Sequence, residues 1–250
     1  MIFTTNNRQH LETTTGIIIK IIPYKDSVSI VRIFTDGHGL IAGMVRLGKA
    51  KTSSLRHICR VMNLVEFEST MQDGRDLQHV NHLRLAYPMQ SIPFDAVKSA
   101  IVLYIGELLS KTLPDQYHNR PLFKFLHDAL LLLDDSEQIQ NFHLWCTTEI
   151  IRHYGFYPEK SHENIHFTCF DFLENTFASQ YPAHPYYLNL EESSLLWILL
   201  DKDWSEVQTI PAGGSVRKGL LDGLLQMINL QLDLRVSYLS LDVLHQVFHE

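Results

Sequence analysis

The sequence predicts an α+β protein in which a small five-stranded β barrel is followed by an all-α domain. β-branched runs separated by turn residues fill the chain from Thr15 to about Arg84, which is typical of short strands. After Pro88, apolar residues recur at three- and four-residue steps, the spacing of amphipathic helices. We therefore predict two domains, 1–86 and 87–250.

The strands of the barrel are predicted at 16–22, 27–35, 40–47, 58–68 and 77–85. Pro23 should end the first strand because proline has no amide proton to donate. Gly37 and Gly39 suit a tight turn, since glycine accepts a positive φ. The small and polar segment 48–54 should form a loop. Five short strands in about 70 residues fit a small closed barrel.

The helices of the second domain follow from apolar spacing. They are predicted at 94–113, before Pro114, at 122–133, and at 142–154, with Gly155 as the left-handed residue after the helix. Later helices are predicted at 193–202, 215–232 and 241–248, the last with Ser240 as its N-cap. Residues 156–190 are rich in Pro, His and aromatics without a period, which predicts an irregular excursion packed on the helices.

The composition is that of a globular protein. Of 250 residues, 45% are apolar and 20% are charged, which excludes a disordered or coiled-coil chain. No apolar run approaches the roughly 18 to 20 residues that span a bilayer, and the polar start lacks the pattern of a secretion signal. Cys59, Cys146 and Cys169 are an odd number at wide spacing, which favours reduced thiols. We expect a cytoplasmic protein without membrane contact.

The net charge of −7 is distributed unevenly. Residues 1–82 carry 10 Lys and Arg against 7 Asp and Glu, a net charge of +3, whereas residues 83–250 carry 11 against 21, a net charge of −10. No acid occurs between Asp36 and Glu66. This one-sign basic region falls within the predicted barrel.

No motif of a known catalytic site is complete. The chain has no phosphate-binding G-x-x-x-x-G-K-[ST] loop, no G-x-G-x-x-G, no G-x-S-x-G elbow and no H-E-x-x-H. Gly213-Gly214-Ser215 could cradle an anion, yet the same residues begin many helices. We therefore assign no catalytic residue and no cofactor, and we do not expect an enzyme.

The excursion contains one group of candidate metal ligands. His162, His166 and Cys169 follow an H-x₃-H-x₂-C spacing, with His184 as a possible fourth ligand. A closed structural zinc site needs about four ligands, so we expect surface histidines beside a packed cysteine and no metal. His143, on an apolar helix face, is expected to be a packing residue whose hydrogen bonds are satisfied.

The basic region indicates nucleic acid. In barrels of this kind a nucleic-acid strand lies across an exposed face of the sheet. Lys and Arg contact its phosphates, and aromatic side chains stack on its bases. Tyr24 and Phe34 are the nearest aromatics, with Phe34 expected in the core. The alternative is that the cations only keep the surface soluble. The candidate phosphate contacts are Lys20, Lys25, Arg32, Arg46, Lys49, Lys51, Arg56 and Arg60.

The order of these segments resembles the bacterial RecO family of DNA repair proteins. Residues 16–55 contain the family's glycine and apolar strand, its Tyr-acid turn, a strand ending Phe-Thr, a glycine turn and a Gly-basic loop. The helical core of the family is similar to FKFLHDALLLLDD and NFHLWCTTEIIRHYGFYP, between Phe123 and Pro158, and to the closing SLDVLHQVF. The likeness covers most of the chain.

The resemblance implies an oligonucleotide-binding (OB) barrel, a helical domain and a recombination mediator. Family members bind and anneal single-stranded DNA. They work with RecR and RecF to load the RecA recombinase on strands coated by single-stranded DNA-binding protein (SSB), whose acidic tail they engage. Many carry paired cysteines for zinc after the Gly-aromatic-x-Pro segment, whereas this chain has only Cys169 there. The acidic helical half is then left for protein partners.

Three hypotheses follow for the function. The leading one is a non-enzymatic factor that binds and anneals single-stranded DNA. The second is an adaptor in repair that has little DNA affinity of its own. The third is a hydrolase built on the histidine-rich excursion, for which no paired acid and base can be named.

Overall fold

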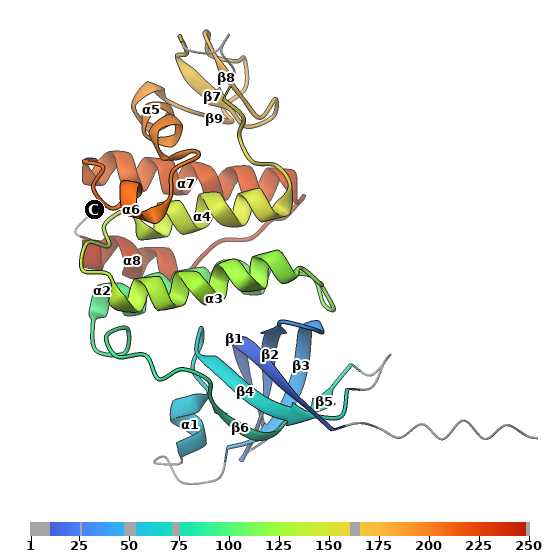
Figure 1. Cartoon of the computed structure of the whole chain (residues 1–250). Helices are drawn as coiled ribbons and strands as arrows, with labels where there is room; N and C mark the ends of the chain where they lie inside the picture. The colour runs from blue at the N-terminus through green and yellow to red at the C-terminus, as the bar shows by residue number, and fades with distance from the viewer. Residues whose placement is uncertain (1–10, 26, 48–53, 72–75, 161–165, 249–250) are drawn as a thin grey trace, which may run out of the picture. The chain divides into compact units, whose positions relative to one another are not determined.

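The structure is a computed structural model that describes residues 11–25, 27–47, 54–71, 76–160 and 166–248. Its contacts divide the chain into two compact units. We call residues 1–89 and 112–130 the barrel unit, and residues 90–111 and 131–250 the helical unit (Figure 1). The domain boundary at residues 86 and 87 stays a prediction.

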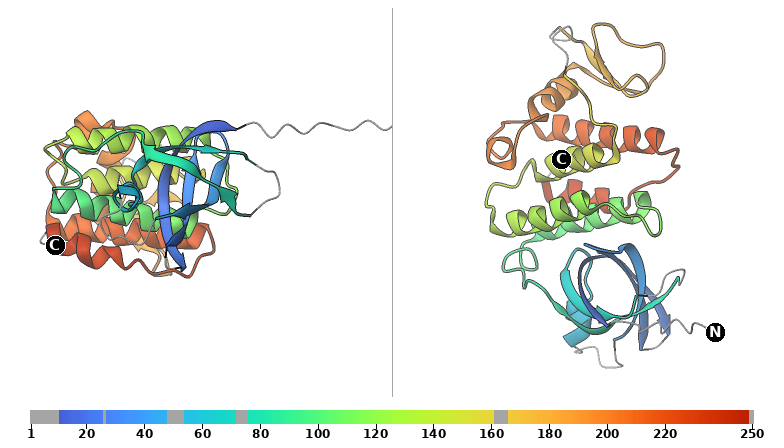
Figure 2. Two further views of the ribbon diagram at one scale, coloured as in Figure 1. Left: turned by 90° about the horizontal axis from the view of Figure 1, so that it is seen from below. Right: turned by 45° about the vertical axis from the view of Figure 1, so that its right-hand side comes forward.

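The barrel unit is built on one curled sheet of six strands, seen on the right of Figure 2. All neighbouring strands are antiparallel except β3 and β5. The edge strands β5 and β6 are consecutive in the chain and meet at Val80, so the sheet curls back on itself. In the order β5-β3-β2-β1-β4-β6 the strands are β1 (Glu12–Lys25), β2 (Val28–Thr35), β3 (Gly39–Arg46), β4 (Leu64–Ser69), β5 (Gln78–His79) and β6 (Asn81–Leu85).

The prediction that Pro23 ends the first strand is wrong. β1 continues to Lys25, and Pro23 stands opposite Ser29 of β2. The pairing of β1 with β4 ends at Ile17, so β1 is an edge strand at Pro23. A proline is tolerated there because its missing amide faces no strand.

Two further strand predictions need correction. The fourth strand was predicted from residue 58, but Ile58 is the last residue of the unpredicted helix α1 (Ser54–Ile58), and β4 begins only at Leu64. Leu55, Ile58 and Cys59 have helical spacing and pack on the barrel core, which the strand interpretation overlooked. The predicted fifth strand is divided at Val80 into β5 and β6, because its two halves pair with opposite edges of the sheet.

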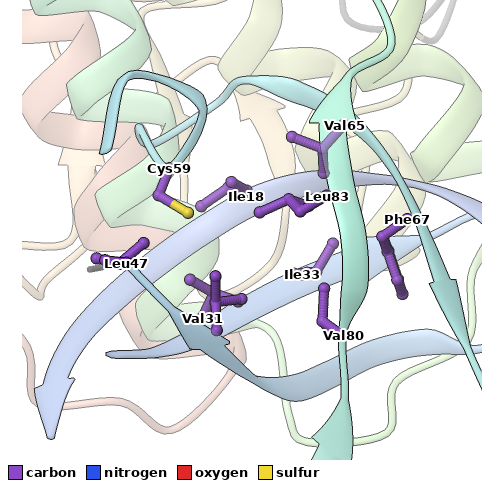
Figure 3. Packing of buried hydrophobic residues seen from close by; sticks show 10 residues of the cluster. Ile18, Val31, Ile33, Leu47, Cys59, Val65, Phe67, Val80 and Leu83 are labelled. Atoms are coloured by element: carbon purple, nitrogen blue, oxygen red, sulfur yellow. The ribbon is translucent and has the colours of Figure 1, made fainter. Parts of the chain in front are cut away.

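The core of the barrel unit is a cluster of aliphatic side chains. Figure 3 shows Ile18, Val31 and Ile33 with Val65 and Leu83 on the inner side of the curled sheet. The first four are fully buried. Burial of one such side chain contributes about 1.5 to 3 kcal/mol, so this cluster supplies much of the stability of the barrel.

The helical unit confirms the all-α prediction for most of its length. Gly155 follows α4 with φ 89°, as predicted. The short helix α6 was not predicted, and no described helix is long and apolar enough to cross a membrane. The helices are α2 (Ala96–Thr112), α3 (Arg120–Asp135), whose first part belongs to the barrel unit, α4 (Phe142–Tyr154), α5 (Leu190–Leu199), α6 (Trp204–Val207), α7 (Gly214–Gln231) and α8 (Ser240–Phe248).

The excursion is more regular than predicted. It contains a small sheet in the order β8-β7-β9, formed by β7 (Cys169–Asp171), β8 (Thr176–Ala178) and β9 (Tyr187–Leu188). Strands of two or three residues are too short to give a detectable alternation in sequence. The aromatic side chains that suggested irregularity are its core, since Phe170 and Phe177 pack edge to face at 4.8 Å.

Glu107 of α2 fixes the start of α8. Its carboxylate accepts hydrogen bonds from the backbone amides of Leu239 and Ser240, the Ser240 hydroxyl and Lys111 Nζ. Ser240 is thus the first helical residue and not the N-cap that the sequence predicted. Burial alone would raise the pKa of Glu107, but these donors outweigh it and lower the pKa from 4.5 to about 2.

Glu107→Gln should therefore destabilise the helical unit by about 1 to 2 kcal/mol, the range for loss of a helix cap. Because the folded pKa lies below the unfolded one, the contribution is present above about pH 4.5 and is lost as the pH falls toward 2. Urea unfolding at pH 7 and pH 3 measures this. A difference between wild type and variant that does not shrink at pH 3 contradicts the assignment.

Candidate nucleic-acid interface

The register of β1 decides which of its side chains face away from the core. Ile18 stands opposite Ile33, but Lys20 stands opposite Arg32, so Ile19 is an extra residue in β1. Without this bulge, strict alternation would place Lys20 opposite the buried Val31. The bulge places Lys20 on the side of the sheet that faces away from the core.

Three rows of side chains cross β1, β2 and β3 on that side. The pairs in register show a first row that is mostly cationic, a second that is apolar and a third that has a cation at each end. We call these three rows the outer face. They are Lys20, Arg32 and Ala42; Ile22, Ile30 and Met44; and Lys25, Val28 and Arg46.

The outer face brings together four of the eight predicted phosphate contacts. Lys20, Lys25 and Arg46 are exposed to solvent. Arg32 is mostly covered, with 17% of its side chain exposed, and its Nη2 donates to Asp115 Oδ1 at 2.6 Å. Cations therefore flank an apolar row on both sides.

A groove of about 430 Å³ includes part of the outer face. Ile22 and Ile30 of the apolar row line it, together with Arg32. Polar groups come from β5, from the residues just before it and from the segment before α3. Among them are the carboxylates of Asp76, which precedes β5, and Asp115. Tyr24 lies at the end of β1, 56% exposed, with Lys25 Nζ 5.4 Å from its ring centre. Apolar surface, an aromatic ring and cations are the groups that single-stranded nucleic acid requires.

The other end of the same side of the sheet is covered. Ile17 and Phe34 stand opposite each other in β1 and β2, and both are fully buried. Phe34 packs edge to face on Phe123 of α3, with ring centres 6.0 Å apart. The Asn119 side chain caps α3 by accepting from the Leu122 amide at 2.9 Å. The expectation that Phe34 belongs to the core is confirmed.

The remaining candidates lie elsewhere or outside the described residues. Arg56 is in α1 and Arg60 follows it, on the element that packs against the core of the barrel. Arg60 Nη2 lies 3.3 Å from His57 Nδ1. Lys49 and Lys51 fall outside the residues that the structure describes.

The candidate metal ligands do not converge in the described part of the excursion. Cys169 is buried, and its thiol donates to the Gln180 carbonyl. His184 Nε2 is 3.3 Å from Asp171, His166 is exposed, and His162 lies outside the described residues. Among the residues described, no group of three His, Cys, Asp or Glu could hold a metal ion.

His143 departs from its prediction in one respect. It is fully buried against Phe248, with ring centres 4.8 Å apart, so it is a packing residue. Neither ring nitrogen has a hydrogen-bond partner among the described residues. Burial, with the nearby charges of Arg217 and His245, lowers the pKa of His143 to about 3 and keeps the ring neutral.

Sequence reasoning missed the apolar row and both carboxylates of the groove. Alternation in β2 could have indicated Ile30, because it lies between the inward-facing positions 29 and 31. Asp115 could not have been found, since it is 83 residues from its partner Arg32 and belongs to no strand. A basic region in sequence thus becomes a mixed surface in the fold.

The curled sheet followed by helices defines an OB-type barrel with a helical domain. A family model described as "Recombination protein O N terminal" matches residues 9–89, and another described as "Recombination protein O C terminal" matches residues 93–238. The chain belongs to the recombination protein O (RecO) family, a family of repair mediators that are not known enzymes.

Curated relatives match over nearly their whole length. DNA repair protein RecO of Flavobacterium psychrophilum is 31% identical over 238 residues, 94% of this chain and 98% of the relative. DNA repair protein RecO of Phocaeicola vulgatus is 27% identical over 241 residues, 95% of this chain and 99% of the relative. The role of the chain therefore lies in DNA repair.

The thiol of Cys169 leads to a prediction about metal. We expect the purified protein to contain no stoichiometric zinc and to keep its melting temperature in chelator, because structural zinc usually contributes folding energy. Elemental analysis and a thermal melt with and without chelator measure this. One zinc per chain that is lost in Cys169→Ser would contradict the expectation and would restore a histidine-rich metal site.

Proposed function

We propose that the protein binds and anneals single-stranded DNA through the outer face. The observation that carries the proposal is the apolar row between two cationic rows, built by the register of β1, β2 and β3. A duplex hides its base faces in stacking, so only a single strand can offer bases to the apolar row and phosphates to both cationic rows.

The dimensions of the sheet support this assignment. Arg32 and Val28 are four residues apart in β2, so the two cationic rows lie about 13 to 14 Å apart at 3.4 Å per residue. Neighbouring strands are about 4.8 Å apart, which makes the outer face about 10 Å wide. This area holds a few nucleotides, consistent with the short site sizes of OB barrels.

Annealing requires no covalent step. Cations that neutralise phosphates reduce the repulsion between two strands and release counterions, so complementary strands can approach and pair. We propose a non-enzymatic mediator that helps load RecA on SSB-coated strands, with RecR, RecF and the SSB tail as partners, as the family resemblance implies. The net charge of −10 on residues 83–250 leaves that part for protein partners and not for DNA. The cytoplasmic location stays a prediction.

A second candidate is an adaptor whose barrel has little DNA affinity. The carboxylates of Asp76 and Asp115 in the groove favour this alternative, because they repel phosphate. The two candidates differ in whether the wild-type chain binds single-stranded DNA at physiological salt.

Replacing Lys20, Lys25 and Arg46 together with Ala should weaken binding of single-stranded DNA equally for all sequences, since phosphate contacts do not read bases. The log-log dependence of affinity on salt should flatten by about 2, at about 0.7 per lost contact. Fluorescence anisotropy of the full chain, in a salt series from about 50 to 200 mM, measures the affinity and its salt dependence.

The matched control replaces Lys202, Lys218 and Arg235 of the helical unit with Ala, which removes the same charge elsewhere. It should leave the slope unchanged. Equal flattening in both variants would mean that only net charge matters and that the outer face is not the binding surface. Absence of binding by the wild-type chain would favour the adaptor.

A further inference from the structure

Arg32, on the middle strand of the outer face, is already paired with an acidic side chain. Arg32 Nη2 donates to Asp115 Oδ1 at 2.6 Å, and both residues line the groove. The two side chains differ in exposure: 17% of Arg32 is exposed against 87% of Asp115. The Asp115 side chain is thus accessible to solvent, whereas the Arg32 side chain is mostly covered.

The backbone fixes the position of Asp115. It stands at a corner of the turn Pro114–Tyr117, which is closed by a hydrogen bond from the Tyr117 amide to the Pro114 carbonyl at 3.3 Å. The Leu40 amide donates to the Tyr117 carbonyl and the Gln116 amide donates to the Leu40 carbonyl, both at 3.1 Å. Gln116 and Tyr117, directly after Asp115, are therefore both bonded to Leu40 of β3.

Gly39 allows the turn to approach β3 this closely. Its φ is +66°, and a Cβ at this position would lie 2.3 Å from the Tyr117 carbonyl oxygen. Gln116 itself has φ 59°, in the left-handed region that residues with side chains rarely adopt. The fold thus holds an unfavourable backbone conformation that keeps Asp115 beside Arg32.

We propose that Asp115 is a built-in competitor for a nucleic-acid phosphate at Arg32. The inference rests on the proposed function, because it assigns regulation to the same outer face. A strand that engages Arg32 must displace the carboxylate, whereas Lys20, Lys25 and Arg46 are exposed and can meet phosphate directly. Arg32 is engaged only by a strand already held on the flanking cations.

This contact makes the outer face selective. A single anion gains little binding free energy at Arg32, since it only takes the place of the Asp115 carboxylate as the acceptor. A strand bound at both cationic rows gains Arg32 as an additional contact near the apolar row. The competitor therefore lowers the affinity of every anion for Arg32, and only a strand that is also held on the flanking cations retains enough affinity to displace the carboxylate.

Asp115→Asn tests the proposal in the full chain, because it removes the charge and keeps the shape of the side chain. An exposed ion pair changes an equilibrium by about fivefold at most, so affinity for a mixed-sequence single strand should rise about two- to fivefold. The salt slope should steepen by up to about 0.7, since phosphate then binds Arg32 without first replacing an existing ion pair. Anisotropy over a salt series gives both numbers.

Two further variants separate loss of the Arg32–Asp115 ion pair from a general loss of negative charge. Asp76→Asn removes a carboxylate from the same groove without touching the Arg32 pair, and its salt slope should stay that of the wild type. In the Arg32→Ala background, Asp115→Asn should no longer steepen the slope or raise affinity by more than Asp76→Asn does. A thermal melt checks folding, and Asp115→Ser serves if Asp115→Asn is unfolded.

The outcomes distinguish the two proposals. If the wild-type chain binds a single strand but Asp115→Asn gives the same slope, or the same gain with and without Arg32, the competitor role is overturned and the binding function stands. If the wild-type chain binds no single strand, both proposals fail.

Discussion

The bulge at Ile19 determines the character of the barrel surface. Four isoleucines and a lysine follow one another from Ile17 to Ile21, and simple alternation cannot place this lysine outside while keeping Ile18 in the core. One extra residue reverses the alternation within β1, so that Ile18 faces the core and Lys20 stands beside Arg32. This reversal puts Lys20 and Ile22 beside Arg32 and Ile30 of β2, and a second shift between Pro23 and Lys25 puts Lys25 opposite Val28.

The same side of the sheet performs two tasks along its length. At one end its row is fully buried, where Phe34 packs on Phe123 and the N-terminal part of α3 is fixed in the barrel unit. A few residues further along the strands the same side is open and carries cations. The segment just before α3 supplies Asp115. The stretch of chain that covers the buried end of the sheet therefore also contacts Arg32 at its open end.

The sequence was sufficient to predict what depends on local pattern. Strand and helix classes, the left-handed Gly155 and the buried Phe34 follow from periodicity and backbone chemistry, and four of the predicted cations share one face. Predictions failed where pairing decided the outcome: Pro23 is tolerated because β1 is an edge strand there, and Glu107 reaches Ser240 across 133 positions. Contacts of this kind depend on tertiary structure, which periodicity does not encode.

The central claim is that single-stranded DNA lies on the outer face of the barrel. Hydrogen exchange of the full chain, with and without a saturating single strand, tests this directly, because bound DNA shields backbone amides from solvent. We expect added protection in peptides that cover β1, β2 and β3, and little change in α4, α5 and α7. Protection confined to the helical unit, with the barrel strands unchanged, would contradict the account.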